Sequence, residues 1–90
     1  MKIAIIGSGG REHALAATIS KSATINEIFC IPGNAGTSLI AKNVSINIMD
    51  NEELLAFVND NNINVTIVGP EQPLENGIVD YMQFINFLKI

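Results

Sequence analysis

Length, composition and charge limit the classes of protein that this sequence can encode. The chain has 90 residues and a formal net charge of −4, so it forms one domain at most, and its few scattered basic residues argue against a nucleic-acid partner. One cysteine excludes an internal disulfide and indicates a reducing, cytoplasmic location, while no apolar run approaches the roughly 18 residues of a membrane span and no signal peptide is expected.

The chain begins with a predicted strand that runs into a cluster of glycines. Residues 3–6 are apolar without polar alternation, as in strands of a parallel sheet that helices cover on both faces. Gly7, Gly9 and Gly10 allow a sharp turn and a close backbone approach to a ligand. A helix is predicted over about residues 11–22, and its first N–H groups would point at the turn. This arrangement predicts an anion site, most often one for phosphate.

Strands and helices alternate through the rest of the chain. Further strands are predicted at 27–31, 64–68 and 87–90, with a short edge-like strand at 44–48. Helices are predicted from an N-cap at Asp50 or Asn51 to about residue 61, and over about 75–86. The alternation predicts an α/β fold, an open parallel Rossmann-like sheet of about four strands with helices on both faces. Because the last predicted strand stops as it begins, we expect a truncated sheet whose unpaired edge favours self-association.

Three glycine-containing loops follow the carboxyl ends of predicted strands, at residues 7–10, 32–37 and 69–74. In an open parallel sheet these strand ends share one edge, where ligands bind. We therefore expect the three loops to converge on one crevice, although they are far apart in the sequence.

Five residues of these loops are candidates for ligand contacts. The Arg11 guanidinium is suited to a forked hydrogen bond to phosphate, although a solvated surface charge is the ordinary alternative. Asn34, Gly36 and Thr37 offer side chains and backbone N–H groups to sugar hydroxyls or a phosphate, unless they form a simple turn. Glu71 lies between two prolines that stiffen its loop, and its carboxylate is placed to accept from ribose hydroxyls or an amine, or to remain a solvated acid.

The first glycine motif also has two alternative interpretations. It is close to a dinucleotide fingerprint, but Glu12 stands where the third glycine belongs and no acid ends the second strand at Ile31-Pro32. We therefore favour a single phosphate, with a dinucleotide-binding module of an oxidoreductase as the alternative. An ordinary turn in a non-catalytic interaction domain is the third interpretation.

Three further residues carry no predicted chemistry. Glu12 would stabilise the helix dipole from the first turn. His13 is the only histidine and has no metal partner in the pattern, so no metal site is predicted. Cys30 has no basic neighbour to activate it and is expected to pack in the core.

The segments 7–14, 32–37 and 68–74 together resemble the N-terminal domain of phosphoribosylamine–glycine ligase, also called glycinamide ribonucleotide synthetase. The order and spacing of all three motifs match, over essentially the whole chain. The resemblance implies a ligase that uses ATP to join glycine to 5-phosphoribosylamine in purine biosynthesis. It further implies substrate-binding roles, with Gly9, Gly10 and Arg11 at the 5-phosphate, Asn34, Gly36 and Thr37 at the ribose, and Glu71 at the ribose or the amine.

The resemblance also implies how the parent enzyme is divided. Residues 1–90 would be an N-terminal substrate-binding domain of the pre-ATP-grasp type, with no catalytic residue and no cofactor of its own. The ATP-grasp domain, which carries ATP and magnesium in the parent enzyme, is absent from this chain. We therefore expect the 90-residue chain to bind the small-molecule substrate and to catalyse nothing alone.

Overall fold

The described part of the chain folds into a parallel sheet with a helix on each face. A computed structural model describes residues 1–69 and 87–89. Its strands are β1 (Lys2–Gly7), β2 (Glu27–Pro32), β3 (Lys42–Asn43), β4 (Val65–Val68) and β5 (Phe87–Lys89). They lie in the order β3-β2-β1-β4-β5, and every neighbouring pair is parallel. The predicted open parallel α/β sheet is confirmed, with β3 as a two-residue addition to the expected four strands.

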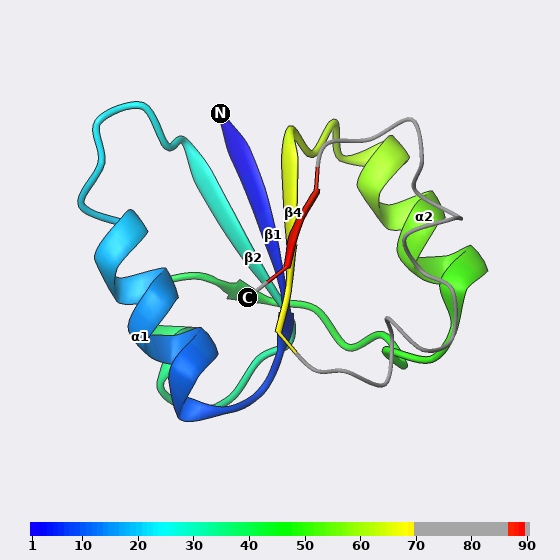
Figure 1. Ribbon diagram of the computed structural model, residues 1–90, viewed down its shortest axis with the longest axis horizontal. Helices are drawn as coiled ribbons and strands as arrows, with labels where there is room; N and C mark the ends of the chain where they lie inside the picture. The colour runs from blue at the N-terminus through cyan, green and yellow to red at the C-terminus, as the bar shows by residue number, and fades with distance from the viewer. Residues whose placement is uncertain (70–86, 90) are drawn as a thin grey trace.

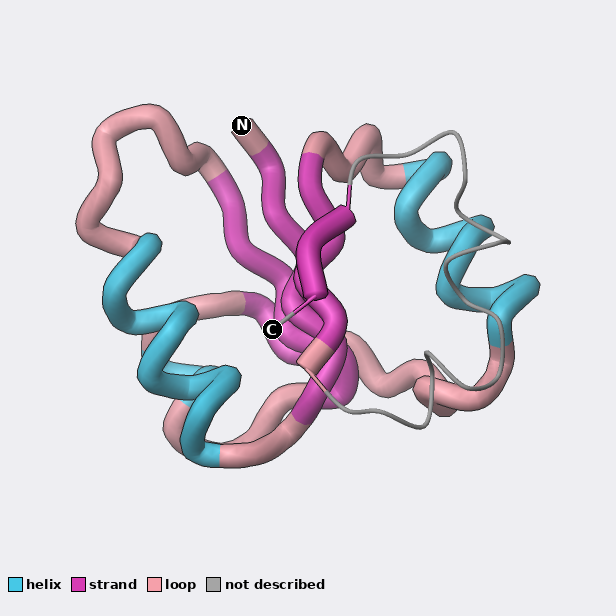
Figure 2. Tube along the Cα trace, viewed as in Figure 1, coloured by secondary structure: helices cyan, strands magenta, loops and turns pink. Residues whose placement is uncertain are grey.

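The two helices described lie on opposite sides of this sheet. Figure 1 shows α1 (Gly10–Ile19) and α2 (Asn51–Asp60) flanking the strands, and Figure 2 shows the strands gathered between them. A short 3-10 helix, η1 (Thr37–Leu39), follows the loop after β2 and was not predicted. The predicted helix at 75–86 lies outside the described residues.

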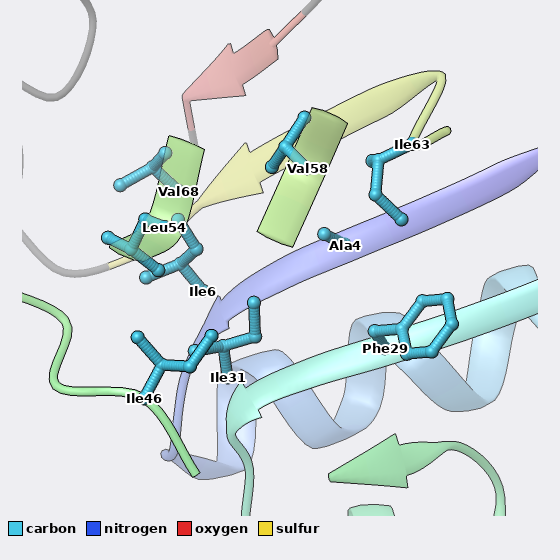
Figure 3. Close-up of a cluster of buried hydrophobic side chains, with 9 residues drawn as sticks. All are labelled: Ala4, Ile6, Phe29, Ile31, Ile46, Leu54, Val58, Ile63 and Val68. Atoms are coloured by element: carbon cyan, nitrogen blue, oxygen red, sulfur yellow. The ribbon is translucent and has the colours of Figure 1, made fainter. Parts of the chain in front are cut away.

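The two faces of the sheet carry separate hydrophobic clusters. On the α2 face, Leu54 and Val58 of the helix pack on strand residues (Figure 3); the buried members of this cluster are Ala4, Ile6, Phe29, Ile31, Ile46, Leu54, Val58, Ile63 and Val68. On the α1 face, Ala16 packs on the alternate residues of the same strands, among them Ile5 and Ile67. Because strand residues point alternately to the two faces, burial on both explains the apolar runs of β1 and β2.

The predicted strand at 44–48 was wrong, and the pairing lies earlier, at Lys42–Asn43. The N–H of Val44 still donates to the carbonyl of Cys30 at 2.8 Å, but the N–H of Ile46 then donates back to the carbonyl of Val44 at 3.1 Å. Ile46 is buried in the α2-face cluster, with Val44 and Ile48 packed beside it. The apolar alternation at 44–48 therefore indicates which side chains face the core. It does not indicate that the segment forms the hydrogen bonds of a strand.

The first helix also ends earlier than predicted, at Ile19 instead of residue 22. The Ser20 hydroxyl donates to the carbonyl of Ala17 at 2.8 Å, and the N–H of Ser22 donates to the carbonyl of Ile19 at 3.0 Å. Serine hydroxyls compete in this way for backbone groups and favour helix ends.

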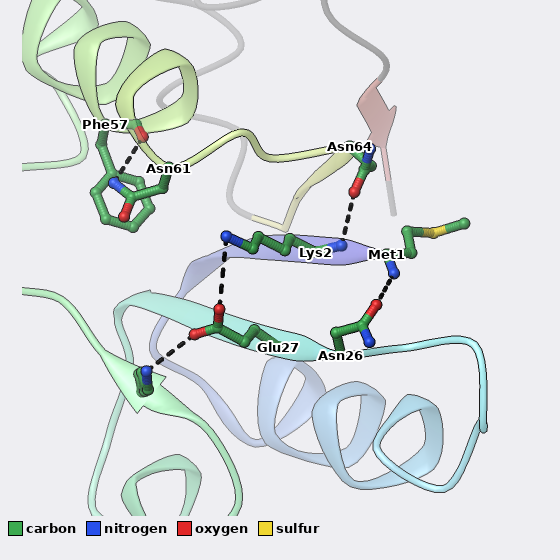
Figure 4. A network of polar contacts seen from close by, with 8 residues as sticks. Met1, Lys2, Asn26, Glu27, Phe57, Asn61 and Asn64 are labelled. Atoms are coloured by element: carbon green, nitrogen blue, oxygen red, sulfur yellow. Dashed lines mark hydrogen bonds and ion pairs between the residues drawn. The ribbon is translucent and has the colours of Figure 1, made fainter.

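Polar contacts tie together the amino ends of the strands, opposite the glycine turn (Figure 4). The carboxylate of Glu27, at the start of β2, pairs with Lys42 at 2.9 Å and with Lys2 at 3.6 Å. The hydrogen bond from the Lys42 ammonium holds the pKa of Glu27 below its ordinary value. The N–H of Lys2 donates to Oδ1 of Asn64 at 2.7 Å, and the N-terminal amine donates to Oδ1 of Asn26. These contacts fix the strand starts, at the edge of the sheet opposite the glycine turn.

Candidate functional site

The first two predicted loops meet at the carboxyl edge of the sheet. The Asn34 side-chain amide donates to the carbonyl of Ser8 at 2.9 Å and to that of Gly9 at 3.3 Å. The N–H of Gly33 donates to the carbonyl of Gly7 at 3.1 Å. The expected convergence of these two loops is therefore confirmed, although 25 positions separate Asn34 from Gly9.

The third loop begins at the same edge. The N–H of Gly69 donates to the carbonyl of Ile6 at 3.0 Å, which extends the pairing of β4 with β1 by one residue. The Arg11 guanidinium donates from Nη2 to the carbonyl of Gly69 at 3.0 Å. Because a guanidinium has five N–H donors, this bond uses only one of them. Glu71 lies outside the described residues, so its predicted contact is not placed.

The glycine turn presents an exposed backbone at the start of α1. Ser8, Gly9, Gly10 and Arg11 are all exposed. An α-helix leaves the N–H groups of its first turn without acceptors inside the helix, and the helix dipole places positive potential there. A Cβ built on Gly10 meets no described atom within 4 Å. We call the carboxyl edge of the sheet with the loop residues 7–11, 33–37 and 69 the rim. Among the described residues, nothing near the backbone at Gly10 blocks an incoming group.

Glu12 lies beneath this turn and is only 6% exposed. Its Oε2 accepts a hydrogen bond from the N–H of Gly9 at 3.1 Å, which is one half of a capping box. A Cβ on Gly7 would lie 2.5 Å from Cγ of Glu12, and one on Gly69 would lie 2.0 Å from its Oε1. Glu12 lies in the first turn of α1, as predicted, but the sequence did not indicate that its side chain is buried between Gly7 and Gly69. The only signal for it is a glutamate three residues after the N-cap.

The loop after β2 is held by its own polar side chains. Oδ1 of Asn34 accepts from the N–H of Thr37 at 2.9 Å, and Oγ1 of Thr37 accepts from the N–H of Asn34 at 2.8 Å. Oγ1 of Thr37 also lies 2.7 Å from Oδ1 of Asn43, and Thr37 is fully buried. These contacts make Asn34 and Thr37 the frame of the loop, while their contact with a ribose stays a prediction.

His13 joins the helix start to the same loop. A Cβ on Gly36 would lie 2.6 Å from Cε1 of the His13 ring, so the ring packs directly on the Gly36 backbone. Neighbouring side chains of the first turn of α1 therefore contact different segments. Glu12 contacts the glycines at the ends of β1 and β4, and His13 contacts the loop after β2. The first turn of α1 is the element around which the rim is assembled.

Cys30 is a core residue behind the rim, and burial raises the pKa of its thiol. The Thr37 hydroxyl partly opposes this effect, and the charge of Glu12 adds to it. Thiol reagents at about pH 8 should leave the thiol of the native chain unmodified, because the reactive thiolate is both disfavoured and inaccessible. A colorimetric disulfide reagent, with and without concentrated guanidinium chloride, checks this. Full modification of the native chain at the rate of the unfolded one would contradict the buried position.

Two other features bear on the kind of site. Within residues 1–69 and 87–89 no group of three or more His, Cys, Asp or Glu side chains is arranged to hold a metal ion, and no helix is long and apolar enough to cross a membrane. A cavity of about 290 Å³ lies beside the starts of β2 and β3, lined by residues 26–28 and 39–42. It is at the other end of β2 from Pro32, so it is separate from the rim.

Known proteins with a similar sequence and fold are ligases or their domains. The family model for the N domain of phosphoribosylglycinamide synthetase matches residues 1–88. Phosphoribosylamine–glycine ligases of Pasteurella multocida and Clostridium acetobutylicum are 54% and 49% identical over 82 and 80 residues, which is 89% of this chain and 19% of each relative. The crystal structure of phosphoribosylamine–glycine ligase from Thermotoga maritima matches with a TM-score of 0.64 and 28% identity, over 80% of this chain and 16% of that one.

These matches also set the extent of the likeness. The chain spans about a fifth of the length of the curated relatives it matches. The part that the family model matches begins with the strand and glycine turn described above. The family match covers β1 to β4 completely and reaches residue 88 in β5. The chain belongs to the family of phosphoribosylglycinamide synthetase N domains.

Proposed function

We propose that this chain is the substrate-binding N-terminal domain of an ATP-dependent ligase that joins glycine to 5-phosphoribosylamine. In this proposal the rim at the carboxyl edge of the sheet binds the phosphoribosyl group. The exposed glycine turn at Gly9 and Gly10 and the Arg11 guanidinium hold the 5-phosphate, with the helix N–H groups from Gly10 onward as donors, because the N–H of Gly9 already donates to Glu12. The loop with Asn34 and Gly36 borders the ribose, and Glu71 faces the ribose or the amine.

One observation carries the proposal above the others. Asn34 bonds to the carbonyls of Ser8 and Gly9, so two loops enclose the exposed start of α1. Phosphate binds well at such helix starts, because unpaired N–H groups and the dipole both favour an anion. The open space over Gly10 and the nearby Arg11 charge add room and a counter-charge.

The alternative, a dinucleotide-binding module, is less well supported. A pyrophosphate fingerprint needs a small residue at the third glycine position so that helix and strand pack closely. Here Glu12 fills that position and occupies the space between Gly7 and Gly69. A single phosphate needs only the turn above it, and residues 8–11 of that turn stay exposed although Glu12 holds the N–H of Gly9.

The remaining parts of the proposal concern the parent enzyme. We assign ATP and Mg²⁺ to an ATP-grasp domain of the parent enzyme, outside residues 1–90, as the membership of the ligase family suggests. The 90-residue chain alone would then bind substrate and catalyse no ligation. A cytoplasmic location, a role in purine biosynthesis and self-association through the sheet edge belong to the same proposal.

Titration of the 90-residue chain with ribose 5-phosphate tests the binding role. We expect this ligand to bind more tightly than ribose, inorganic phosphate or NAD, by isothermal titration calorimetry. A Gly10→Asp variant places a carboxylate where a Cβ meets no described atom. Its charge should weaken ribose 5-phosphate binding about tenfold or more, because like charges a few ångströms apart repel by more than 1 kcal/mol near a protein surface.

The matched control is Ala14→Asp, which adds the same charge to the exposed side of α1 one turn further along. Its affinity for ribose 5-phosphate should stay within about twofold of wild type. Tighter binding of NAD than of ribose 5-phosphate would favour the dinucleotide module instead. Binding of neither ligand would favour the interaction domain and contradict the proposal.

A further inference from the structure

We propose that Glu12 is a positioning residue, whose carboxylate sets the spacing between the glycine turn and the end of β4 in the phosphate site. This inference rests on the proposed function for what the rim binds, but not for how the rim is built. Glu12 itself would touch no substrate, because it is 6% exposed and lies beneath the turn.

The contacts of the carboxylate reach both sides of the rim. Oε2 accepts from the N–H of Gly9 at 3.1 Å on the α1 side. On the β4 side, Oε1 lies close to the backbone of Gly69, since a Cβ built on Gly69 would be 2.0 Å from it. One rigid planar group therefore lies between two backbone segments that are 60 positions apart in the chain. The Arg11 bond to the carbonyl of Gly69, at 3.0 Å, closes the same gap from the outer side.

The glycine at position 69 has no other explanation among the described contacts. Only Gly7 and Gly33 have a positive φ among the described glycines, so a positive φ is not the reason for glycine at position 69. Within the described part of the chain, the three atoms nearest to a Cβ there all belong to Glu12. The Glu12 side chain therefore occupies the space that a side chain at position 69 would need, so a glutamate at position 12 requires a glycine at position 69.

The negative charge of Glu12 indicates that this residue positions the backbone of the rim and does not attract the phosphate. A carboxylate beneath an anion site repels the anion, so it cannot serve by drawing phosphate in. Its value must come from its length and from the oxygen that holds the N–H of Gly9. Glutamine keeps both, whereas aspartate keeps the charge and is one methylene shorter.

The first experiment needs no ligand and measures thermal unfolding of the 90-residue chain in a double-mutant cycle. Gly69→Ala should lower the melting temperature by roughly 10 °C in the wild-type background, because the new methyl group meets Oε1. In the Glu12→Ala background the same change should lower it by less than about 3 °C, since the space is then empty. Equal losses in the two backgrounds would overturn the inference.

The second experiment measures ribose 5-phosphate affinity in variants of Glu12. Glu12→Gln should bind within about twofold of wild type, and Glu12→Asp at least about tenfold more weakly. The matched controls are Glu53→Gln and Glu53→Asp, because Glu53 is exposed and holds the same third position in α2 after its N-cap, Asp50. Neither control should change the affinity.

The outcomes separate the inference from the proposed function. Wild-type affinity in Glu12→Asp, or equal losses in Glu12→Asp and Glu12→Gln, would overturn the positioning role while leaving the phosphate site standing. If the wild-type chain binds no ribose 5-phosphate, the proposed function fails and the unfolding cycle alone decides the inference. If Glu12→Asp does not fold, the unfolding cycle and the affinity of Glu12→Gln decide it.

Discussion

A Gly7→Ala variant is expected to lose most of the stability of the fold, whereas a Gly10→Ala variant is expected to keep it. Gly7 has a φ of +147°, a region that is nearly closed to residues with a Cβ. Its added methyl group would also lie 2.5 Å from Cγ and 2.6 Å from Cδ of the buried Glu12. Backbone strain of about 1–3 kcal/mol and this overlap together approach the whole stability of a domain this small.

Gly10 is the control within the same motif. It begins α1, and a Cβ there meets no described atom within 4 Å. Alanine is favoured over glycine in helices by up to about 1 kcal/mol, so the variant should melt at or above the wild-type temperature. Circular dichroism during heating measures both variants. A Gly7→Ala chain that melts within about 3 °C of wild type would contradict the described turn.

The fold was predictable because its strongest signals are local. The apolar runs at residues 3–6 and 28–31 have the composition of strands buried on both faces, and the structure places both in interior strands of the sheet. The segment 44–48 was not predictable in the same way. Alternation of apolar side chains arises from any chain that runs along a core, and only the hydrogen bonds of Val44 and Ile46 distinguish it from a strand.

The meeting of the loops at the candidate site was predictable from the sequence, but the contacts that build it were not. Parallel strand ends must share an edge, so the meeting of the loops followed from the order of elements. The roles of the glycines did not follow, because glycine serves equally for a ligand and for a neighbouring side chain. Gly10 faces open space, whereas Gly7 and Gly69 face Glu12, and that difference depends on how α1 packs against β4.

The polar residues show the same limit. Asn34 and Thr37 have polar side chains of the kind that contact ligands. If the loop were isolated, these side chains would be free to bind a ligand. In the structure their polar atoms bond to each other and to Ser8, Gly9 and Asn43. Residue type alone does not separate a side chain that holds a ligand from one that holds the loop, because both tasks need the same donors and acceptors.

A Leu54→Ala variant is expected to show a large loss of stability from the core, with Leu39→Ala as its matched control. Leu54 is fully buried and packs from α2 onto the strands, as Figure 3 shows. Removing a buried leucine side chain leaves a cavity and costs about 2–5 kcal/mol. For a domain of this size that loss lowers the melting temperature by roughly 10–30 °C.

Leu39 makes the comparison specific to burial. Its side chain is 85% exposed at the end of η1, so the same substitution removes no core contact and should change stability by less than about 0.5 kcal/mol. Urea unfolding of both variants, followed by circular dichroism, gives the two free energies side by side. Equal small losses would mean that α2 does not pack on this face of the sheet. Equal large losses would mean that Leu39 is covered in solution, most directly by a second copy of the chain, and a dependence of the midpoint on protein concentration would identify that case.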